Sequence, residues 1–282
     1  MTLPALLPGA TASAVTGAYA RLAEVFPGLR AEVLPDGEEM PRGVGWVRAD
    51  ELAAGGAALD VFLARDHAQM VRDYGQQPRP DVVAGFGLHR YAWPACLLVT
   101  VPWFLYRRVP RIPVADVAIQ RALGRMAVRV REFACLPDDP AAGLPGARVV
   151  RDEAALRGEV LAAVADHMGP VLDGFRPRMR RGRRALWGMA TDEVVEGLWY
   201  VAHLLGEERR AMAELEALLP GTTGPYVGTA GFRELTGPDG EPLPTRDRVS
   251  CCLFYTLRPD DTCVTCPRTC DADRVRKLTS AH

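Results

Sequence analysis

The stretch YAWPACLLVTVPWFLY, from Tyr91 to Tyr106, is the most apolar segment of the 282-residue chain and carries no charged side chain. It is too short to cross a bilayer, which takes about 20 apolar residues, and Pro94 and Pro102 interrupt it. We therefore expect it to be buried core and not an integral membrane segment. Together with the residues from Pro80 onward, it predicts a broken helix packed at the centre of the fold.

The composition limits the class of protein. Apolar residues make up 48% of the chain, enough for a real core in one large domain or two smaller ones. A formal net charge of -1 argues against a dedicated nucleic-acid binder. No basic residue precedes Arg21, so no secretory signal is expected, and we predict a cytoplasmic protein. Thiols stay reduced there, and its seven cysteines are then more typical of metal or redox chemistry than of disulfides.

Helical periodicity surrounds the apolar segment on both sides. Apolar residues at helical spacing predict helices over 11–26, 50–74, 152–175, 184–205 and 207–219. Thr11 or Ser13 is the expected N-cap of the first helix. Gly55 and Gly56 weaken the first half of the second.

A strand pattern lies between the helical segments. Residues from Met126 to Phe133 alternate apolar and polar, as in a strand with one solvated face. A loop rich in Asp, Pro and Gly follows at 137–146, and the sequence ARVVRD comes next, so we predict a β-hairpin. The fold class is therefore predicted as α+β: a helix-rich body over 1–235 with a small hairpin or sheet, and an irregular C-terminal cysteine module over 236–282.

The C-terminal stretch CCLFYTLRPDDTCVTC, from Cys251 to Cys266, holds four of the seven cysteines. A C-x2-C turn lets two sulfurs converge on one metal, and a second pair brought back by the intervening loop completes a four-sulfur site. Zinc and iron–sulfur clusters both accept such a site. Structural zinc usually takes each pair from a short knuckle, which the adjacent Cys251 and Cys252 cannot form. The spacing favours an iron–sulfur cluster but leaves zinc and unligated thiols open.

The segments SCCLFY (250–255) and CVTCPR (263–268) together resemble the C-terminal signature of the FhuF-like ferric siderophore reductases. The likeness rests on the adjacent cysteines, the aromatic pair Phe254 and Tyr255, the ten-residue spacer and Pro267. The segments RALWGMATDEVVEGL (184–198) and GFRELTGPDG (231–240) resemble weaker parts of the family pattern. The resemblance implies a [2Fe–2S] cluster held by Cys251, Cys252, Cys263 and Cys266. It gives Cys270 no role and implies no catalytic residue beyond the cluster.

The resemblance also implies a reaction. Siderophores hold Fe(III) with hard oxygen ligands that bind Fe(II) far less well, so adding one electron makes the iron labile. The expected function is therefore one-electron reduction of a ferric siderophore, of the hydroxamate type, with release of Fe(II) in the cytosol. The sequence contains no dinucleotide or flavin motif, so a ferredoxin or a flavin-dependent reductase is the expected electron donor.

Arginines gather in two places. Those that flank the cysteines could tune the cluster, contact the substrate, or be solvated loop residues; they are Arg246, Arg248, Arg258 and Arg268. The stretch RPRMRRGRR (176–184) could dock an acidic ferredoxin or an anionic siderophore, or be a solvated loop.

The remaining polar and aromatic candidates are expected to be structural. Core or surface positions are predicted for His67, His89, His167, His203, Trp187 and Trp199. Asp192 and Glu193 are interpreted as carboxylates on a helix surface. Cys96 is expected to be a buried apolar residue, and Cys135 to end a strand.

Two other hypotheses stay open on the sequence. The first is a structural four-cysteine zinc module on a helical protein that binds a partner. The second is a body that resembles the helical part of siderophore synthetases, which would require nucleotide binding; the sequence shows no ATP-binding motif.

Overall fold

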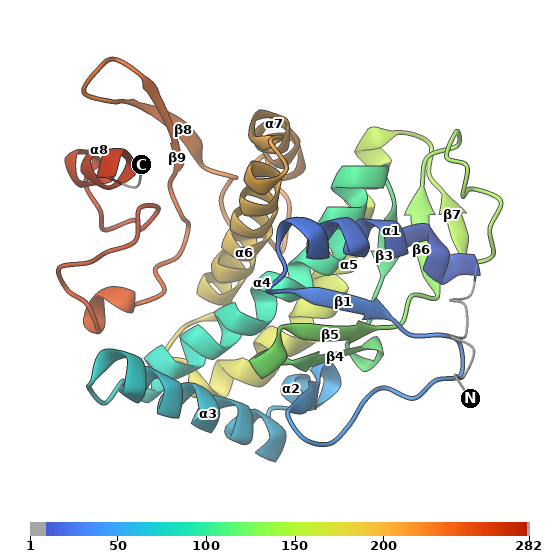
Figure 1. The fold of residues 1–282 in the computed structure, drawn as a ribbon, viewed down its shortest axis with the longest axis horizontal. Coiled ribbons are helices and arrows are strands. Elements are labelled where there is room, and N and C mark those ends of the chain that lie inside the picture. The colour runs from blue at the N-terminus through green and yellow to red at the C-terminus, as the bar shows by residue number, and fades with distance from the viewer. Residues whose placement is uncertain (1–9, 281–282) are drawn as a thin grey trace.

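The computed structural model describes residues 10–280 of the chain. Its central element is helix α4 (Pro80–Tyr106), the longest helix described, and four other long helices pack around it (Figure 1). They are α1 (Ala10–Val25), α3 (Ala57–Tyr74), α5 (Glu153–Phe175) and α6 (Arg183–Leu204). The shorter helices are α2 (Ala49–Ala54), α7 (Glu208–Leu218) and α8 (Asp271–Ser280). The α+β class with a helix-rich body is confirmed.

Helix α4 confirms the expected buried core but corrects the prediction of a broken helix. Pro94 and Pro102 both lie inside one continuous helix of 27 residues. An internal proline costs about 3 kcal/mol, whereas each fully buried aliphatic side chain gains about 1.5–3 kcal/mol, and α4 buries side chains around its whole circumference. By length and composition α4 could cross a membrane, but 78% of its apolar window is buried inside the protein.

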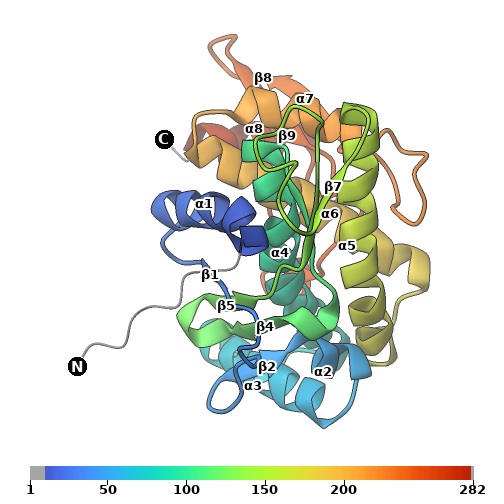
Figure 2. The same ribbon diagram turned by 90° about the vertical axis from the view of Figure 1, so that its right-hand side faces the viewer.

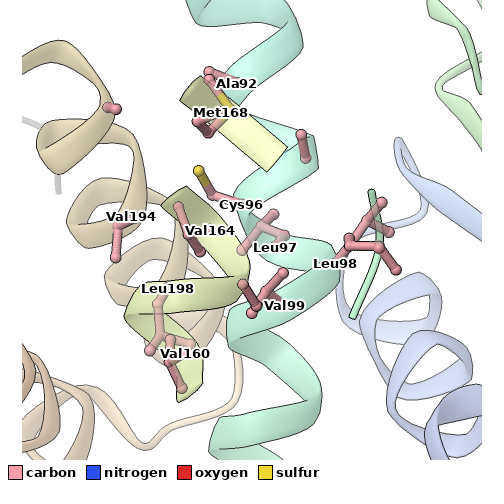
Figure 3. Close-up of a cluster of buried hydrophobic side chains, with 14 of the residues drawn as sticks. Ala92, Cys96, Leu97, Leu98, Val99, Val160, Val164, Met168, Val194 and Leu198 are labelled. Atoms are coloured by element: carbon pink, nitrogen blue, oxygen red, sulfur yellow. The ribbon is translucent and has the colours of Figure 1, made fainter. Parts of the chain in front are cut away.

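The side chains of α4, α5 and α6 interlock at the centre of the protein. In Figure 3, Cys96 and Leu97 of α4 lie among Val160 and Val164 of α5 and Leu198 of α6. Cys96 is buried among these apolar groups, which raises the pKa of its thiol. The expectation that Cys96 is a buried apolar residue is confirmed.

The predicted helix over 50–74 is divided by its glycines. Gly55 has a φ of 69°, a left-handed conformation that ends α2, and α3 begins at Ala57. A Cβ atom on Gly55 would lie 2.9 Å from the carbonyl oxygen of Gly174 in α5, so the glycine is needed for close packing as well as for the turn. The predicted helices over 152–175, 184–205 and 207–219 are confirmed within a residue or two as α5, α6 and α7.

The predicted N-cap of the first helix is wrong. Helix α1 includes Ala10, so Thr11 and Ser13 lie inside it. The Thr11 hydroxyl instead donates a hydrogen bond to the carbonyl oxygen of Pro145 at 2.6 Å.

Two small sheets accompany the helices of the body. The first has the order β1-β5-β4-β2, and the second β3-β6-β7. Their bounds are β1 (Arg30–Val33), β2 (Trp46–Arg48), β3 (Val109–Arg111), β4 (Val117–Gln120), β5 (Arg125–Val128), β6 (Glu132–Cys135) and β7 (Ala147–Val149). Strands β1 and β5 are parallel, and so are β6 and β7. Figure 2 shows β1, β5 and β4 between α1 on one side and α2 and α3 on the other.

The predicted hairpin over 126–133 and 147–152 is wrong. Residues 126–133 are divided between β5 and β6, which belong to different sheets, and β7 runs parallel to β6. Between the two strands, Arg129 and Arg131 both pair with the buried carboxylate of Asp116, at 2.9 and 3.3 Å. Cys135 is the buried last residue of β6, as expected.

The C-terminal segment contains more regular structure than predicted. Strands β8 (Phe232–Thr236) and β9 (Pro242–Arg246) form an antiparallel hairpin, and α8 follows the cysteines. The boundary at 235/236 stays a prediction, and residue 236 is the last of β8. His282 lies outside the described residues.

One buried histidine makes the stability of the fold depend on pH. The Nδ1 atom of His167 hydrogen-bonds the carbonyl oxygen of Ile112, and its Nε2 atom the hydroxyl of Tyr91, both at 2.7 Å. Burial lowers the pKa of His167 to about 4. In the unfolded chain this pKa is about 6.5, so below that pH the unfolded state binds the proton more readily than the folded state.

We therefore predict that the free energy of unfolding is largest above about pH 6.5 and falls as the pH is lowered toward the folded pKa. Between pH 7 and pH 5 this one group should remove about 2 kcal/mol. Urea unfolding at both pH values would measure the loss. The His167→Asn variant keeps a donor for Ile112 and should lose less than the parent over this interval; an equal loss would contradict the assignment.

Candidate metal centre

The structure brings together the four cysteines of the sequence motif. Cys251, Cys252, Cys263 and Cys266 lie on the loops between β9 and α8. The four thiols influence one another electrostatically: Cys251 interacts with Cys266 and Cys252, and Cys263 interacts with Cys252 and Cys266. All four are free thiols; Cys266 is buried and the others are half-buried. Cys270 is also free, but it is exposed.

The local backbone directs N–H groups at the sulfurs. Leu253 has a φ of 66°, which is uncommon for a residue with a side chain. In this conformation its N–H donates to the Sγ of Cys251 at 3.4 Å. The N–H of Arg268 donates to the Sγ of Cys266 at the same distance, just beyond a turn in which the N–H of Cys266 bonds the carbonyl of Cys263. Such N–H···S contacts stabilise thiolate charge.

The electrostatics favour a thiolate at Cys252. A hydrogen bond from Cys263 lowers the pKa of Cys252 to about 6, and the N–H of Phe254 and the charge of Arg248 act in the same direction. The same interaction raises the pKa of Cys263. Burial is the largest cause of the raised pKa of Cys251.

The chemistry of the donor set fits a [2Fe–2S] cluster. Such a cluster takes four cysteine sulfurs on two irons, whereas a tetrahedral zinc site takes four ligands on one ion. Four cysteine thiols lie on this segment, and backbone N–H groups are directed at the sulfurs of Cys251 and Cys266.

Asp192 of α6 anchors the cysteine segment to the body. Its carboxylate accepts hydrogen bonds from the Arg246 guanidinium at 2.8 Å and from the backbone N–H groups of Val249 and Ser250 at 2.9 and 2.8 Å. The Ser250 hydroxyl also donates to it at 2.6 Å. Asp192 and Arg246 are fully buried. The residue immediately before the first cysteine is thereby fixed to a core helix.

Gly188 of α6 makes this approach possible. A Cβ atom there would lie 3.2 Å from the side chain of Val249, closer than most Cβ contacts. The position is one helical turn before Asp192, so the backbone around Ser250 can lie against the helix beside its anchor.

A second contact holds the loop between Cys252 and Cys263. The Phe254 ring packs against Tyr74 of α3 and Phe86 of α4, with ring centroids 5.8 and 6.2 Å apart. Leu257 is buried with apolar residues of the same two helices, and its carbonyl accepts a 2.6 Å hydrogen bond from Gln76. In Figure 1 this part of the loop lies beside the first turns of α4.

The four arginines that flank the cysteines have different surroundings. Arg246 is buried and belongs to the Asp192 anchor. Arg248 is 10% exposed and lies 3.6 Å from the Asp192 carboxylate. The guanidinium of Arg258 lies 5.7 Å from the Tyr74 ring centroid, and that of Arg268 lies 4.1 Å from the Tyr255 ring centroid. Only Arg248 among them combines near-burial with an electrostatic effect on a cysteine of the motif.

The arginine-rich stretch 176–184 reaches the cysteine segment at one point. Arg181 donates a hydrogen bond to the carbonyl oxygen of Cys251. Arg178 pairs with Asp60 of α3 at 2.6 Å. These two arginines are therefore paired within the protein, and they fix the α5–α6 connection to neighbouring elements.

The interpretation of Asp192 and Glu193 as surface carboxylates is wrong. Both are buried, and Glu193 hydrogen-bonds the Nδ1 atom of His89 at 2.8 Å. The attraction of Glu193 is the main cause of the raised pKa of His89. A signal was present in the sequence, because Met189, Ala190, Val194 and Val195 surround the two acids with apolar side chains. Charged groups in so apolar a stretch need buried partners.

The other singled-out residues take structural positions, as expected. Trp187 is buried against Tyr226, and the Trp199 ring packs on Phe232. His203 is exposed and lies 3.2 Å from Glu208. His67 is half-buried on α3.

Comparison with known proteins supports the sequence resemblance. Residues 248–268 match the family model of the FhuF 2Fe-2S C-terminal domain. The matched segment contains all four cysteines of the motif, and the cofactor of that domain is a [2Fe–2S] cluster. The FhuF-like resemblance of the C-terminal segment is thus confirmed, and it marks the chain as carrying a redox iron–sulfur domain. No curated protein matched the chain.

We predict that Asp192→Asn loosens the cysteine segment. The change leaves the buried Arg246 charge with a weaker partner, and breaking a buried ion pair typically costs about 3–5 kcal/mol. Thermal unfolding, together with iron and sulfide content per chain, would measure the loss. Asp173→Asn changes an exposed carboxylate on α5 and should leave both quantities at parent values. Parent stability and iron content in Asp192→Asn would show that this carboxylate is not the anchor.

Proposed function

We propose that Cys251, Cys252, Cys263 and Cys266 hold a [2Fe–2S] cluster. The observation that carries the proposal is that four cysteines, none in a disulfide, lie together on one segment within the matched domain. The N–H groups of Leu253 and Arg268 lie where they can balance sulfur charge.

We further propose that the protein is a cytoplasmic ferric siderophore reductase. When bound, a [2Fe–2S] cluster supplies one electron at a time. The chelated iron gains that electron and passes from Fe(III) to Fe(II), and an external ferredoxin or flavin-dependent reductase replaces it. The hard oxygen ligands bind Fe(II) weakly, so they release it and take up protons from water. A hydroxamate siderophore is the proposed substrate.

In this proposal the body (1–235) and the cysteine module (236–282) divide the work. The module holds the redox centre, and the helices keep it in place through the Asp192 carboxylate and the Phe254 ring. Both contacts limit movement of the sulfurs, and less movement lowers the reorganisation that electron transfer requires. The buried Arg246 acts by fixing this geometry.

The structural zinc module remains the second hypothesis from the sequence. The match of residues 248–268 to a 2Fe-2S domain supports the cluster over a single ion. Metal analysis separates the two directly, because a zinc module would be colourless and contain one zinc per chain.

Serine substitutions test the ligand assignment. Each of Cys251→Ser, Cys252→Ser, Cys263→Ser and Cys266→Ser should abolish or shift the visible absorption and the rhombic spin-one-half EPR signal of the reduced protein, because serine replaces a soft thiolate. Cys270→Ser is the matched control, because this cysteine is exposed and lies outside the matched segment. A parent spectrum in all four variants would refute the assignment.

The reaction is tested with anaerobically purified protein that has been reduced with dithionite and freed of excess reductant. We expect one Fe(II) to appear, trapped by a ferrous-specific chelator, for each cluster reoxidised by a ferric trihydroxamate. A cluster that reduces normally but is not reoxidised by ferric chelates would contradict the reductase function while leaving the cluster assignment intact.

A further inference from the structure

A surface pocket of about 480 Å³ lies where α4, α6 and the cysteine segment meet. Pockets of about 300–1,000 Å³ suit small-molecule ligands. Its wall includes three aromatic rings, two basic side chains and one cysteine of the motif: Phe26, Trp93, Tyr200, His89, Arg248 and Cys263. This pocket therefore adjoins the proposed redox centre.

The three rings form one aromatic cluster at the surface. Phe26 meets Trp93 and Tyr200 edge to face, with centroids 5.5 and 5.7 Å apart, and Trp93 lies 6.0 Å from Tyr200. Phe26 and Trp93 are half-buried, and Tyr200 is 44% exposed. Rings that hold one another in place present a rigid apolar surface, so little side-chain entropy is lost when a ligand binds.

Helix geometry sets the position of these groups. His89 and Trp93 lie one turn apart on α4, and Glu196 and Tyr200 one turn apart on α6. Between the helices, a Cβ atom on Gly197 would lie 3.3 Å from Leu97, so the glycine permits the close approach. The same Cβ atom would lie 3.6 Å from Nε1 of Trp93, so the Trp93 ring lies beside this close contact and lines the pocket.

The charges on the pocket wall are already paired within the protein. His89 bonds Glu193, and Arg248 faces the Asp192 carboxylate. Glu196 accepts hydrogen bonds from Arg246 at 3.0 Å and from the Thr265 hydroxyl at 2.7 Å. A ligand with a large charge of either sign would meet both signs at once. A ligand with an apolar exterior and little net charge fits this wall better.

One polar atom of the wall is left for such a ligand. The His89 ring bonds Glu193 through Nδ1, so its Nε2 atom is the one left for a ligand, and the His89 side chain is 44% exposed. The Nε atom of Arg248 is buried and lies 3.6 Å from Asp192, so Arg248 contributes positive charge to the wall and not this atom as a donor.

We propose that this pocket binds the ferric siderophore, with the three rings against its hydrocarbon frame and with His89 and Arg248 near its oxygen ligands. The inference rests on the proposed reductase function. A trihydroxamate complex fits because three singly charged ligands cancel the charge of Fe(III). A trianionic tris-catecholate complex would meet the carboxylate of Glu196 on the pocket wall.

The test compares two tyrosines of equal exposure. Tyr200→Ala removes the exposed ring of the pocket, and Tyr106→Ala removes a ring that is also 44% exposed but stands at the C-terminal end of α4, outside the pocket lining. Trp93→Leu is the second pocket variant. We expect KM for ferric desferrioxamine, a linear trihydroxamate, to rise about tenfold in both pocket variants and to stay at the parent value in Tyr106→Ala. The rate with ferricyanide and the cluster spectrum should not change.

Equilibrium binding supplies a readout without turnover. Gallium(III) desferrioxamine has the same charge and cannot accept the electron; calorimetry on the oxidised holoprotein should show a Kd about tenfold weaker in the two pocket variants. The tris-catecholate complex of gallium should bind the parent at least about tenfold more weakly than the trihydroxamate.

The outcomes separate the two proposals. A parent that reduces ferric desferrioxamine while both pocket variants keep its KM and the gallium Kd would overturn the pocket assignment alone, as would an equal effect of Tyr106→Ala. Tighter binding of the catecholate would overturn the charge argument for the ligand class. A parent with an intact, reducible cluster that neither reduces nor binds the chelates would overturn the reductase function and the pocket together.

Discussion

The buried carboxylate of Asp192 is the contact on which the arrangement of the metal centre depends. It accepts four hydrogen bonds, which join α6 to Arg246 at the end of β9 and to the backbone of Val249 and Ser250. A carboxylate and a guanidinium without exposed surface are stable only when their hydrogen bonds are satisfied. This requirement gives the segment before Cys251 one defined position on the core helix.

The rest of the centre follows from that fixed point. Beyond Ser250 the chain turns at Leu253, which directs a backbone N–H at Cys251, and the Phe254 ring then enters the contact with Tyr74 and Phe86. The loop is thus attached on α6 at one side and on α3 and α4 at the other. These two attachments hold the four cysteines of the motif in place, although the segment has few aliphatic residues of its own.

Helices α4 and α6 also connect the candidate metal centre to the core. Helix α4 is buried around its circumference and lies beside α3, α5 and α6, so its first turns can support the Phe254 ring while its middle lies in the core. The same helix and α6 carry His89, Trp93 and Tyr200 to the pocket beside Cys263. One packed helix pair therefore serves the core, the metal centre and the adjoining pocket.

The sequence by itself determined the elements whose information is local. Periodicity located α5, α6 and α7, apolar composition identified the core segment, and the spacing of Cys251, Cys252, Cys263 and Cys266 indicated a four-sulfur centre. Only the tertiary structure decided that α4 is unbroken, that β6 and β7 are parallel, and that Asp192 and Glu193 are buried. These features depend on partners far away in the chain: Arg246 lies 54 residues from Asp192 and His89 lies 104 residues from Glu193. The burial that overrides a proline, or that pairs a carboxylate, arises only when those distant groups meet.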